Sequence, residues 1–415
     1  MMEENQLYIP EGWEAKELGT LYLEKRKSKF KVSDATNYGG IPFYTSGDAI
    51  LVHNETQTDG ENIFLATGGI ANVKFYNGKV AYSTDTYVIV GKENIDTQFL
   101  YFKILDQLYY INTNYFQGSG LKHLQKKDFR KHLFVIPKTK GEQQSIANIL
   151  SKCDKAIAQT EALIAKYTQI KTGLMQDLLT KGIDENGNIR SEETHEFKDS
   201  PLGRIPKEWE CEPIGDCCYV TKLAGYEFTL HMKYREDGEI IALRALNIKN
   251  EDLVLDDIQR ISQSVSDFLI RSKLFTGDIL ITYIGAYIGD VVQIKENDKY
   301  HLAPNIAKIV VGKKLTPDFL EMILRTQKVQ NQFKSLTTTT ANPSLTMGQI
   351  RKSYILFPQD KEEQIRIAIK LQSLRKHFLN LKSELSKLQS LKTGLMQDLL
   401  SGKVRVNNLM KEKQN

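Results

Sequence analysis

Two long segments of the chain carry apolar residues at alternating steps of four and three, with polar residues between them. The first stripe begins at Ile146 and the second at Ile367. A period of 3.5 residues held over several heptads is typical of the seam between paired helices. The predicted seam residues are Ile146, Leu150, Ile157, Ile164, Leu174 and Leu178 in the first segment, and Ile367, Leu371, Phe378, Leu385, Leu395 and Leu399 in the second.

The two stripes belong to an internal repeat. Lys171–Leu179 and Lys392–Leu400 both read KTGLMQDLL, so the copies lie 221 residues apart (392 − 171 = 221). Shared register favours pairing of the two helices with each other, although any amphipathic core helix can carry such a stripe. Each helix of roughly 39 residues would be ~58 Å long at ~1.5 Å per residue. The short link after the first helix favours an antiparallel pair, because the second helix can then start where the first ends.

The repeat also includes the segment before each helix. Pro10 and Trp13 match Pro206 and Trp209, at an offset of 196 (209 − 13 = 196). The second segment is longer, and its interior differs greatly from that of the first. One scaffold presenting two different binding surfaces would produce this pattern, and so would simple divergence after duplication.

Within these segments the residues alternate as in strands. Residues 79–90 and 277–294 are rich in β-branched and aromatic residues, and glycines mark tight turns beside them. Short helices are predicted at 97–110 and 317–329, among the strands. Because strands and helices do not follow each other as βαβ units, each segment is predicted to be α+β.

The predicted fold class is therefore α+β: two mixed domains with a core mainly of strands and turns, separated by long antiparallel coiled-coil helices related by a pseudo-two-fold axis. The charged segment between the first helix and the second domain is expected to cross the surface. The predicted parts are a first domain at 1–139, a central helix at 140–180, a linker at 181–206, a second domain at 207–360, a C-terminal helix at 361–402 and a tail at 403–415.

Composition is that of an ordinary soluble protein. The 415 residues are 26% charged and 41% hydrophobic, which suffices for two or three domains. A net charge of +5 permits an anionic partner without requiring one. The chain shows no signal peptide and no apolar run of about 18 residues, so we expect it to be cytoplasmic.

Catalytic motifs are missing. The sequence contains neither a GxxxxGK[ST] phosphate loop nor a GxSxG elbow, and its cysteines and histidines lack the spacing of a metal site. Asn342–Leu345 partly matches an Asn-Pro-Pro-aromatic methyltransferase motif, but it lacks the second proline and the aromatic residue, so we interpret it as a turn. We therefore expect a binding protein with no catalytic residues, no metal and no cofactor of its own.

Several polar clusters are candidates for binding nucleic acid. Basic runs are suited to phosphates, and hydroxyl, amide and aromatic groups near glycine turns can contact bases. The same runs are typical of a solvated face, and the turn residues of local capping. The candidates are Lys27, Lys29, Thr67, Gly68, Gly69, Ser119, Lys122, His123, Lys126, Arg244, Asn247, Tyr283, Tyr287, Thr338, Thr339, Thr340, Asn342 and Ser344.

Taken together, the chain resembles the specificity (S) subunit of type I restriction-modification systems over essentially its whole length. The resemblance rests on the duplicated architecture, on the helix starts GEQQSIANIL and EEQIRIAIKL, on the paired KTGLMQDLL endings and on the linker end KDSPLGRIPKEW. It implies two target-recognition domains that each read half of a bipartite, asymmetric double-stranded DNA site. The helices would then set the gap between the halves.

The resemblance also implies partners. Two modification (M) methyltransferase subunits and further restriction (R) subunits would assemble on this chain, and the cofactors SAM, ATP and Mg would belong to those subunits. The rival interpretation is a non-catalytic coiled-coil adaptor that binds proteins instead of DNA. A third, an enzyme with divergent motifs, would need an acid–base set that the sequence does not display.

Overall fold

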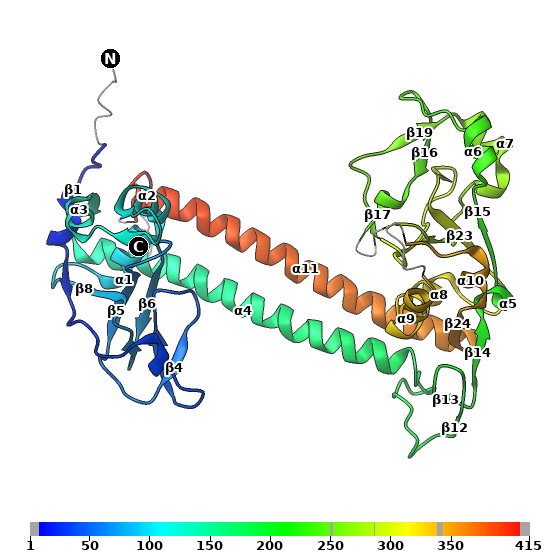
Figure 1. Cartoon of the computed structure of the whole chain (residues 1–415), viewed down its shortest axis with the longest axis horizontal. Coiled ribbons are helices and arrows are strands. Elements are labelled where there is room, and N and C mark those ends of the chain that lie inside the picture. The colour runs from blue at the N-terminus through cyan, green and yellow to red at the C-terminus, as the bar shows by residue number, and fades with distance from the viewer. Residues whose placement is uncertain (1–7, 250–251, 286, 338–342, 407–415) are drawn as a thin grey trace, which may run out of the picture. The chain divides into compact units, whose positions relative to one another are not determined.

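The computed structural model describes residues 8–249, 252–285, 287–337 and 343–406 (Figure 1). The chain divides into two compact units. Unit 1 comprises residues 1–163 and 381–415, and unit 2 comprises residues 164–380. Two long helices, α4 (Lys140–Leu178) and α11 (Lys361–Leu400), contribute to both units, because the division falls within each of them.

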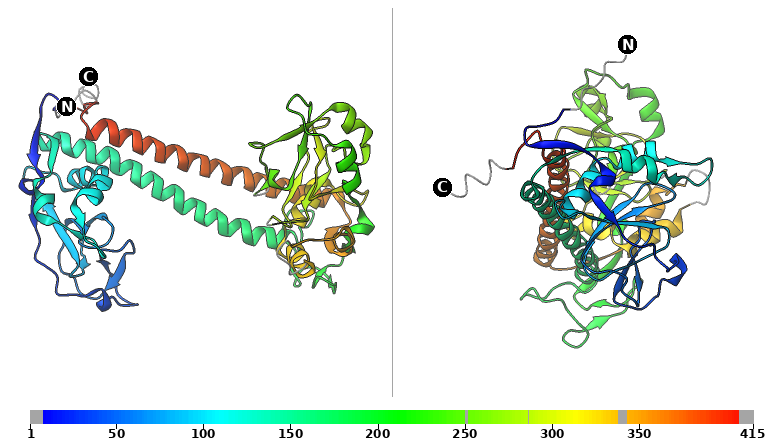
Figure 2. Two further views of the ribbon diagram at one scale, coloured as in Figure 1. Left: turned by 45° about the horizontal axis from the view of Figure 1, so that its top comes forward. Right: turned by 90° about the vertical axis from the view of Figure 1, so that its left-hand side faces the viewer.

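Helices α4 and α11 run antiparallel in each unit. In unit 1, Lys392 of α11 forms an ion pair with Asp154 of α4 at 2.5 Å. In unit 2, the rings of Tyr167 and His377 lie 4.6 Å apart. Residue numbers thus fall along α11 as they rise along α4, and Figures 1 and 2 show the last turns of α11 beside the first turns of α4 in unit 1. The predicted antiparallel pair of long helices is confirmed.

The predicted seam residues differ in burial. Those at the helix ends join the cores of the globular parts and are at most 6% exposed: Ile146, Leu150, Leu178, Ile367, Leu371 and Leu399. The others are half-buried. Leu174 and Leu395 pack against the cores from outside, whereas beyond the cores one facing helix covers only one side of the remaining four: Ile157, Ile164, Phe378 and Leu385.

The globular part of unit 1 is built on two sheets. A four-stranded sheet has the order β2-β8-β5-β6, a three-stranded sheet has the order β4-β3-β7, and β1 pairs with β11. The strands are β1 (Trp13–Glu17), β2 (Tyr22–Glu24), β3 (Ile41–Tyr44), β4 (Leu51–His53), β5 (Glu61–Ala66), β6 (Val73–Asn77), β7 (Ala81–Tyr82), β8 (Thr86–Gly91), β9 (Phe116–Gln117), β10 (His123–Leu124) and β11 (Leu133–Pro137). The helices are α1 (Thr97–Asp106), α2 (Leu108–Tyr115) and α3 (Lys126–Lys131), with 3-10 turns η1 (Leu18–Thr20) and η2 (Val32–Asp34).

Unit 2 repeats this topology. Its four-stranded sheet has the order β15-β23-β20-β21, its three-stranded sheet has the order β19-β16-β22, and β14 pairs with β24. The strands are β12 (Phe197–Lys198), β13 (Ile205–Pro206), β14 (Trp209–Pro213), β15 (Cys218–Lys222), β16 (Ile240–Leu243), β17 (Ile248–Lys249), β18 (Asp252–Leu253), β19 (Gln259–Ile261), β20 (Ile279–Thr282), β21 (Val291–Gln293), β22 (Tyr300–Leu302), β23 (Ile306–Val311) and β24 (Tyr354–Pro358). The helices are α5 (Ile214–Cys217), α6 (Gly225–His231), α7 (Gln263–Phe268), α8 (Pro317–Leu324), α9 (Gln327–Leu336) and α10 (Met347–Lys352), with 3-10 turns η3 (Ala245–Asn247) and η4 (Ile270–Ser272).

The predicted α+β class is confirmed in both units, with one correction to the helices. Each short helix predicted from the sequence is a pair of shorter helices, α1–α2 and α8–α9. The chain leaves helical geometry at Gln107 and again at Thr326, where extended backbone precedes α9.

The linker at 181–206 does more than cross the surface. Ile183 and Ile205 are at most 2% exposed and belong to the core of unit 2. Arg190 donates to both carboxylate oxygens of Glu363, at 2.5 and 3.0 Å, and Trp209 donates to the same carboxylate at 3.1 Å. We call Arg190, Glu363 and Trp209 the clasp of unit 2. It ties the segment after α4 to the start of α11 and to β14.

Unit 1 has an equivalent clasp. Arg405, which follows α11, donates to both carboxylate oxygens of Glu142 at 2.7 and 2.9 Å, and Trp13 donates to Glu142 at 3.4 Å. In both units a glycine with positive φ lies between the end of the long helix and the clasp arginine, where the chain turns back. Gly182, with φ 66°, lies between α4 and Arg190, and Gly402, with φ 73°, lies between α11 and Arg405. The globular part of unit 1, which leads into α4, is therefore held by the segment that follows α11. The globular part of unit 2, which leads into α11, is held by the segment that follows α4.

Candidate nucleic-acid interface

In unit 1 the glycine turn after β5 lies against the segment that leads into β10. Gly69 donates its backbone N–H to the carbonyl of Lys122 at 2.8 Å, and Leu124 donates to the carbonyl of Thr67 at 3.0 Å. Between these two bonds Gly68 and His123 form an antiparallel bridge. Residues 67–72 and 117–124 thus form one element, the paired loops of unit 1.

Unit 2 contains the same element. Gly285 donates to the carbonyl of Pro343 at 3.2 Å and Leu345 donates to the carbonyl of Tyr283 at 2.9 Å. Ile284 and Ser344 form the bridge between them. The described residues 283–285 and 287–289, with 343–345, are the paired loops of unit 2.

The two elements correspond bond for bond. One strand of each pair is related by an offset of 216 (283 − 67 = 216) and the other by 221 (343 − 122 = 221). The side chains at matched positions differ: Thr67 corresponds to Tyr283, and His123 to Ser344. Only the glycine with positive φ, Gly69 at 82° and Gly285 at 98°, recurs among the turn residues. The backbone is therefore shared, and the chemistry that it presents is not.

Six of the predicted contact residues of unit 1 lie on this element. Ser119, Lys122 and His123 are exposed, whereas Thr67 and Gly68 are half-buried. The Oγ1 of Thr67 donates to the carbonyl of Asp85 at 2.6 Å, which anchors the turn to the loop before β8. Gly69 is half-buried too, and a side chain there would meet no atom within 4 Å, so the turn lies open to a ligand.

The predicted residues of unit 2 are distributed less evenly. Tyr287 is 42% exposed, with the ammonium of Lys249 5.4 Å from its ring centre, whereas Tyr283 is only 7% exposed. Ser344 is half-buried within the paired loops. The predicted contacts Thr338, Thr339, Thr340 and Asn342 lie outside the described residues.

Asn247 is an internal residue. It is 0% exposed, its side-chain oxygen accepts from the N–H of Arg244 at 3.0 Å, and its amide donates to the carbonyls of Val254 and Asp257. Every polar atom of its side chain is thus used within the loop, which argues against the predicted contact with nucleic acid. Arg244 is half-buried and forms an ion pair with Asp257 at 2.7 Å.

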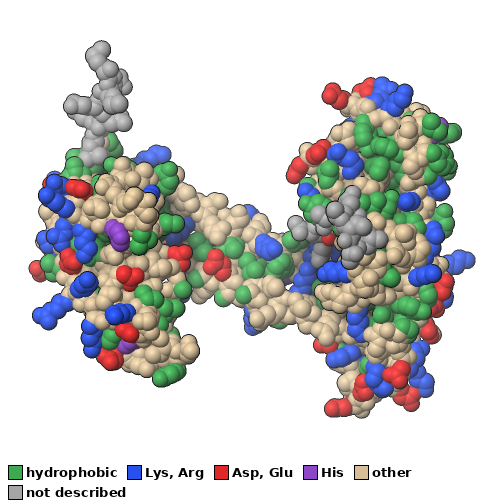
Figure 3. Space-filling view, viewed as in Figure 1, with side chains coloured by type: hydrophobic (Ala, Val, Ile, Leu, Met, Phe, Trp, Pro, Cys, Tyr) green, Lys and Arg blue, Asp and Glu red, His purple; other side chains and the backbone are tan. Residues whose placement is uncertain are grey.

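The basic candidates Lys27, Lys29 and Lys126 are exposed, and the latter two have acidic neighbours. Lys29 lies 3.4 Å from Glu55, and Lys126 lies 3.2 Å from Glu24 and 3.8 Å from the ring centre of Tyr87. Figure 3 shows Lys and Arg side chains gathered over α3 of unit 1. They form a positive surface of the kind that attracts phosphates.

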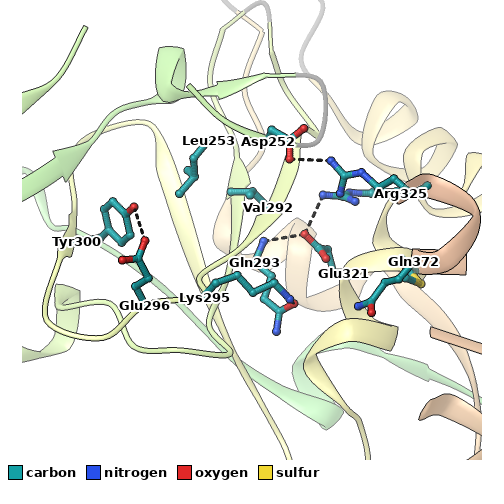
Figure 4. A pocket seen from close by; sticks show the side chains of 12 residues that line it. Asp252, Leu253, Val292, Gln293, Lys295, Glu296, Tyr300, Glu321, Arg325 and Gln372 are labelled. Carbon is teal, nitrogen blue, oxygen red and sulfur yellow. Dashed lines mark hydrogen bonds and ion pairs between the residues drawn. The ribbon is translucent and has the colours of Figure 1, made fainter. Parts of the chain in front are cut away.

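A polar pocket of about 520 Å³ in unit 2 contains charged groups that serve the fold (Figure 4). Arg325 donates to Glu321 at 2.8 Å, the backbone N–H of Gln293 donates to the same carboxylate at 2.9 Å, and Arg375 donates to Asp252 at 2.7 Å. The first two contacts join Arg325 and β21 to α8, and the third joins α11 to β18. Since each carboxylate accepts from a neighbouring group, the pocket does not have the arrangement of a catalytic acid–base pair.

Among the described residues, no three His, Cys, Asp or Glu side chains are grouped as metal ligands. None of the described helices combines the length and apolarity needed to cross a membrane. The paired loops present exposed polar and basic side chains and are therefore the candidate interface.

Sequence reasoning missed two exposed apolar residues on this element, Ile70 and Leu121, which are 79% and 66% exposed. A signal was present in the sequence, because each follows a glycine in a polar turn where nothing apolar is needed for a core. It also missed the clasp arginines, whose carboxylate partners are remote in sequence.

Comparisons with known proteins agree with this geometry. The family described as "Type I restriction modification DNA specificity domain" matches residues 10–169 and 206–390. The MjaVIII specificity subunit of Methanocaldococcus jannaschii is 24% identical over 429 residues, covering 98% of this chain and 96% of that protein. The EcoBI specificity subunit of Escherichia coli is 22% identical over 391 residues, covering 90% and 81%.

Solved structures share the fold. The S subunit of a type I restriction-modification system from M. genitalium superposes with a TM-score of 0.65 at 14% identity, covering 96% of this chain and 98% of that one. A chain from a structure on complex assembly and conformational transition of the type I R-M system has a TM-score of 0.50 at 15% identity, covering 96% and 100%.

Proposed function

Because the chain belongs to the family of type I restriction-modification DNA specificity proteins, we propose that it recognises a bipartite, asymmetric site in double-stranded DNA. It does so without catalysis of its own, as the DNA-recognition subunit of a type I restriction-modification complex. The modification and restriction subunits that assemble on it supply SAM, ATP and Mg. The adaptor interpretation is not favoured, since the family description names DNA specificity.

The observation that carries the proposal is the duplicated frame with different contents. Both units hold a glycine turn by the same two backbone bonds, yet the exposed His123 of one corresponds to Ser344 of the other. Side chains that face base edges specify sequence, whereas backbone and phosphate contacts fix position. A shared frame with unlike side chains is suited to reading two different half-sites from equivalent positions.

The remaining predicted contacts have different roles within this proposal. Lys122, His123 and Ser119 in unit 1, with Tyr287 and Ser344 in unit 2, would contact bases. Lys27, Lys29 and Lys126 are suited to phosphates and would contribute affinity without sequence preference. Arg244 would likewise contact a phosphate, because the ion pair with Asp257 already occupies part of its guanidinium.

A second shared feature supports two copies of one partner. In the repeated KTGLMQDLL segments the buried positions are the same, and so are the exposed ones: Thr172, Gly173 and Gln176 in α4, and Thr393, Gly394 and Gln397 in α11. Core packing explains the identity of the buried leucines. It does not explain the identity of these exposed positions, because most other aligned exposed positions of the two helices differ, with Lys140/Lys361, Lys155/Lys376 and Lys166/Lys387 as identical pairs.

The helical glycines sharpen this point. Gly173 and Gly394 lie within long helices, where glycine costs about 1 kcal/mol relative to alanine. A side chain at either residue would meet no atom within 4 Å, so the fold itself does not require glycine there. Close approach of a partner at both places accounts for the pair. In unit 2 a groove of about 590 Å³, lined partly by Thr172, Met175 and Gln176, lies beside this surface.

Expression with a candidate methyltransferase subunit, followed by sequencing of modified adenines, tests the proposal. We expect methylation at one bipartite motif with two unlike halves. Exchanging residues 1–137 for the same domain of a relative should change one half of the motif and leave the other intact. Loss of all motif specificity, or a simultaneous change of both halves, would contradict independent reading by the two units.

A further inference from the structure

The paired loops of unit 1 carry an apolar pair for which the fold has no use. Ile70 and Leu121 are 79% and 66% exposed, although each adjoins a residue of the Gly69–Lys122 hydrogen bond. Single exposed apolar side chains are common on proteins. Two of them beside the same backbone hydrogen bond, on one glycine-rich element, are less common and call for an explanation.

One backbone hydrogen bond brings these residues near each other. Gly69 donates to the carbonyl of Lys122 at 2.8 Å, and Ile70 and Leu121 are the chain neighbours of its donor and its acceptor residue. Lys122 and His123, both exposed, follow Leu121 along the chain.

The chemistry of base edges limits which groups Ile70 and Leu121 can recognise. Their side chains have neither a hydrogen-bond donor nor an acceptor, so they cannot hydrogen-bond to the polar groups of base edges. The apolar group that the major groove presents is the C5-methyl of thymine. The neighbouring Lys122 and His123, both exposed, supply the polar and positive groups that such a contact needs around it.

We propose that Ile70 and Leu121 are specificity-determining residues, which select thymine in the half-site of unit 1 by contact with its C5-methyl group. The inference rests on the proposed function and deepens it. It assigns the selection of thymine in this half-site to two residues, and it assigns polar readout of adjoining bases to Lys122 and His123.

Deoxyuridine provides a test at the level of one methyl group, because it pairs like thymine and lacks only the C5-methyl. The full-length chain, assembled with its methyltransferase subunit, is titrated with duplexes that carry thymine or uracil at each position of the first half-site. We expect uracil to weaken binding about fourfold at each contacted position, the effect of one buried methyl group. The same exchange in the second half-site serves as an internal comparison.

Variants of the two residues test the protein side of the same contact. Ile70→Ser and Leu121→Ser should weaken binding to the thymine duplex and bind thymine and uracil duplexes equally. Tyr109→Ser is the matched control, since Tyr109 is an exposed side chain of α2 in the same unit, and it should keep the wild-type discrimination. Circular dichroism checks that each variant is folded.

Three results would overturn the inference while leaving the proposed function intact: a first half-site without thymine on either strand, wild-type binding that is indifferent to uracil, or unchanged discrimination in both serine variants. An equal loss of affinity for both duplexes in the serine variants, together with reduced DNA bending, would instead indicate a wedge between base steps. If the wild-type complex selects no bipartite site, the proposed function fails, and the inference fails with it.

Discussion

Unit 1 and unit 2 share a frame and differ in what the frame holds. The sheets have the same order, the same glycine turn is tied by the same bonds, and each base is closed by a Trp–Glu–Arg clasp. The exposed loop residues differ almost throughout. The backbone geometry and the clasp contacts are thus the same in both units. The exposed loop side chains differ without any change in the fold.

The comparison also reveals buried differences. Lys103 in α1 corresponds to Ile323 in α8, since the residues that start these helices, Asp96 and Thr316, donate to Gln143 and Gln364 in the same way. Ile323 is packed in an apolar core. Lys103 is only 4% exposed and donates to the carbonyl of Leu400 at 2.9 Å, at the end of α11. Unit 1 therefore holds a buried cation where unit 2 holds a hydrocarbon.

The largest effect is expected from breaking the clasp of unit 2. Glu363→Ala leaves the guanidinium of Arg190, whose side chain is 10% exposed, without its carboxylate, which should cost about 3–5 kcal/mol. Glu142→Ala should cost less, about 1–3 kcal/mol, because Arg405 is 26% exposed and water can reach it.

Hydrogen exchange of β14–β24 and of β1–β11 separates the two effects by unit. The double variant Arg190→Met/Glu363→Leu is the control, and it should recover much of the loss because it buries no unpaired charge. Equal destabilisation of both units by the two alanine variants would contradict the assigned difference in burial.

Lys103 should give unit 1 a pH dependence that unit 2 lacks. Burial lowers the pKa of Lys103 from 10.5 to about 8. Between these values the unfolded chain binds more protons than the folded one, so the free energy of unfolding rises with pH across this window and is flat below it. Lys103→Met should remove this rise and stabilise unit 1 at pH 7 by about 1–2 kcal/mol, after loss of the bond to Leu400.

Urea unfolding of wild type and variant at pH 7 and pH 10, followed by exchange in β1–β11, measures this effect. The difference between the two proteins cancels other titrating groups. Ile323→Met is the matched substitution in unit 2 and should leave the pH dependence unchanged. If the free energy of unfolding changed equally with pH in the wild type and in Lys103→Met, the prediction would be wrong.

Single loop substitutions should alter one half-site each. Lys122→Ala should reduce preference at one position of the first half-site by about 1–3 kcal/mol, and Ser344→Ala should do so in the second. Lys126→Ala is the comparison, since a phosphate contact weakens binding to all sequences alike and lowers the salt dependence. Selection from a random duplex library measures all three, and loss of preference in the wrong half would break the assignment of loops to halves.

The smallest effect on the fold should come from the helical glycines. Gly173→Ala and Gly394→Ala should each stabilise their helix by about 1 kcal/mol, because nothing lies within 4 Å of the added Cβ. Each should nevertheless weaken one of two partner contacts. Native mass spectrometry of the complex would then show one bound methyltransferase subunit in the single variants and none in the double variant. Two bound copies in the double variant would exclude this surface.

The frame could be predicted from the sequence because periodicity and repetition carry it. The stripe from Ile146 to Leu178, repeated 221 residues later, determined both helices and their pairing. The clasps could not be predicted, since Arg190 and Arg405 meet partners 173 and 263 residues away and nothing local distinguishes them from other surface arginines.

The candidate site was predicted only in part, for a related reason. Side-chain type and a neighbouring glycine selected the loops of both units, yet these signals do not reveal burial. Asn247 has the right chemistry and is enclosed by its own turn, whereas Ile70 has no polar chemistry and stands in the open. Tertiary structure decides which side chain of a turn is presented.

Unit 1 is made of two segments that a ribosome synthesises far apart in time. Residues 1–163 emerge first, but residues 381–415 follow only after the 217 residues from 164 to 380, roughly 10–40 s later at ~5–20 residues per second. During that interval Glu142 waits for Arg405, and Ile146 and Leu150 lack the last turns of α11. Unit 1 therefore cannot form its clasp until Arg405 has been synthesised, although most of its residues precede unit 2.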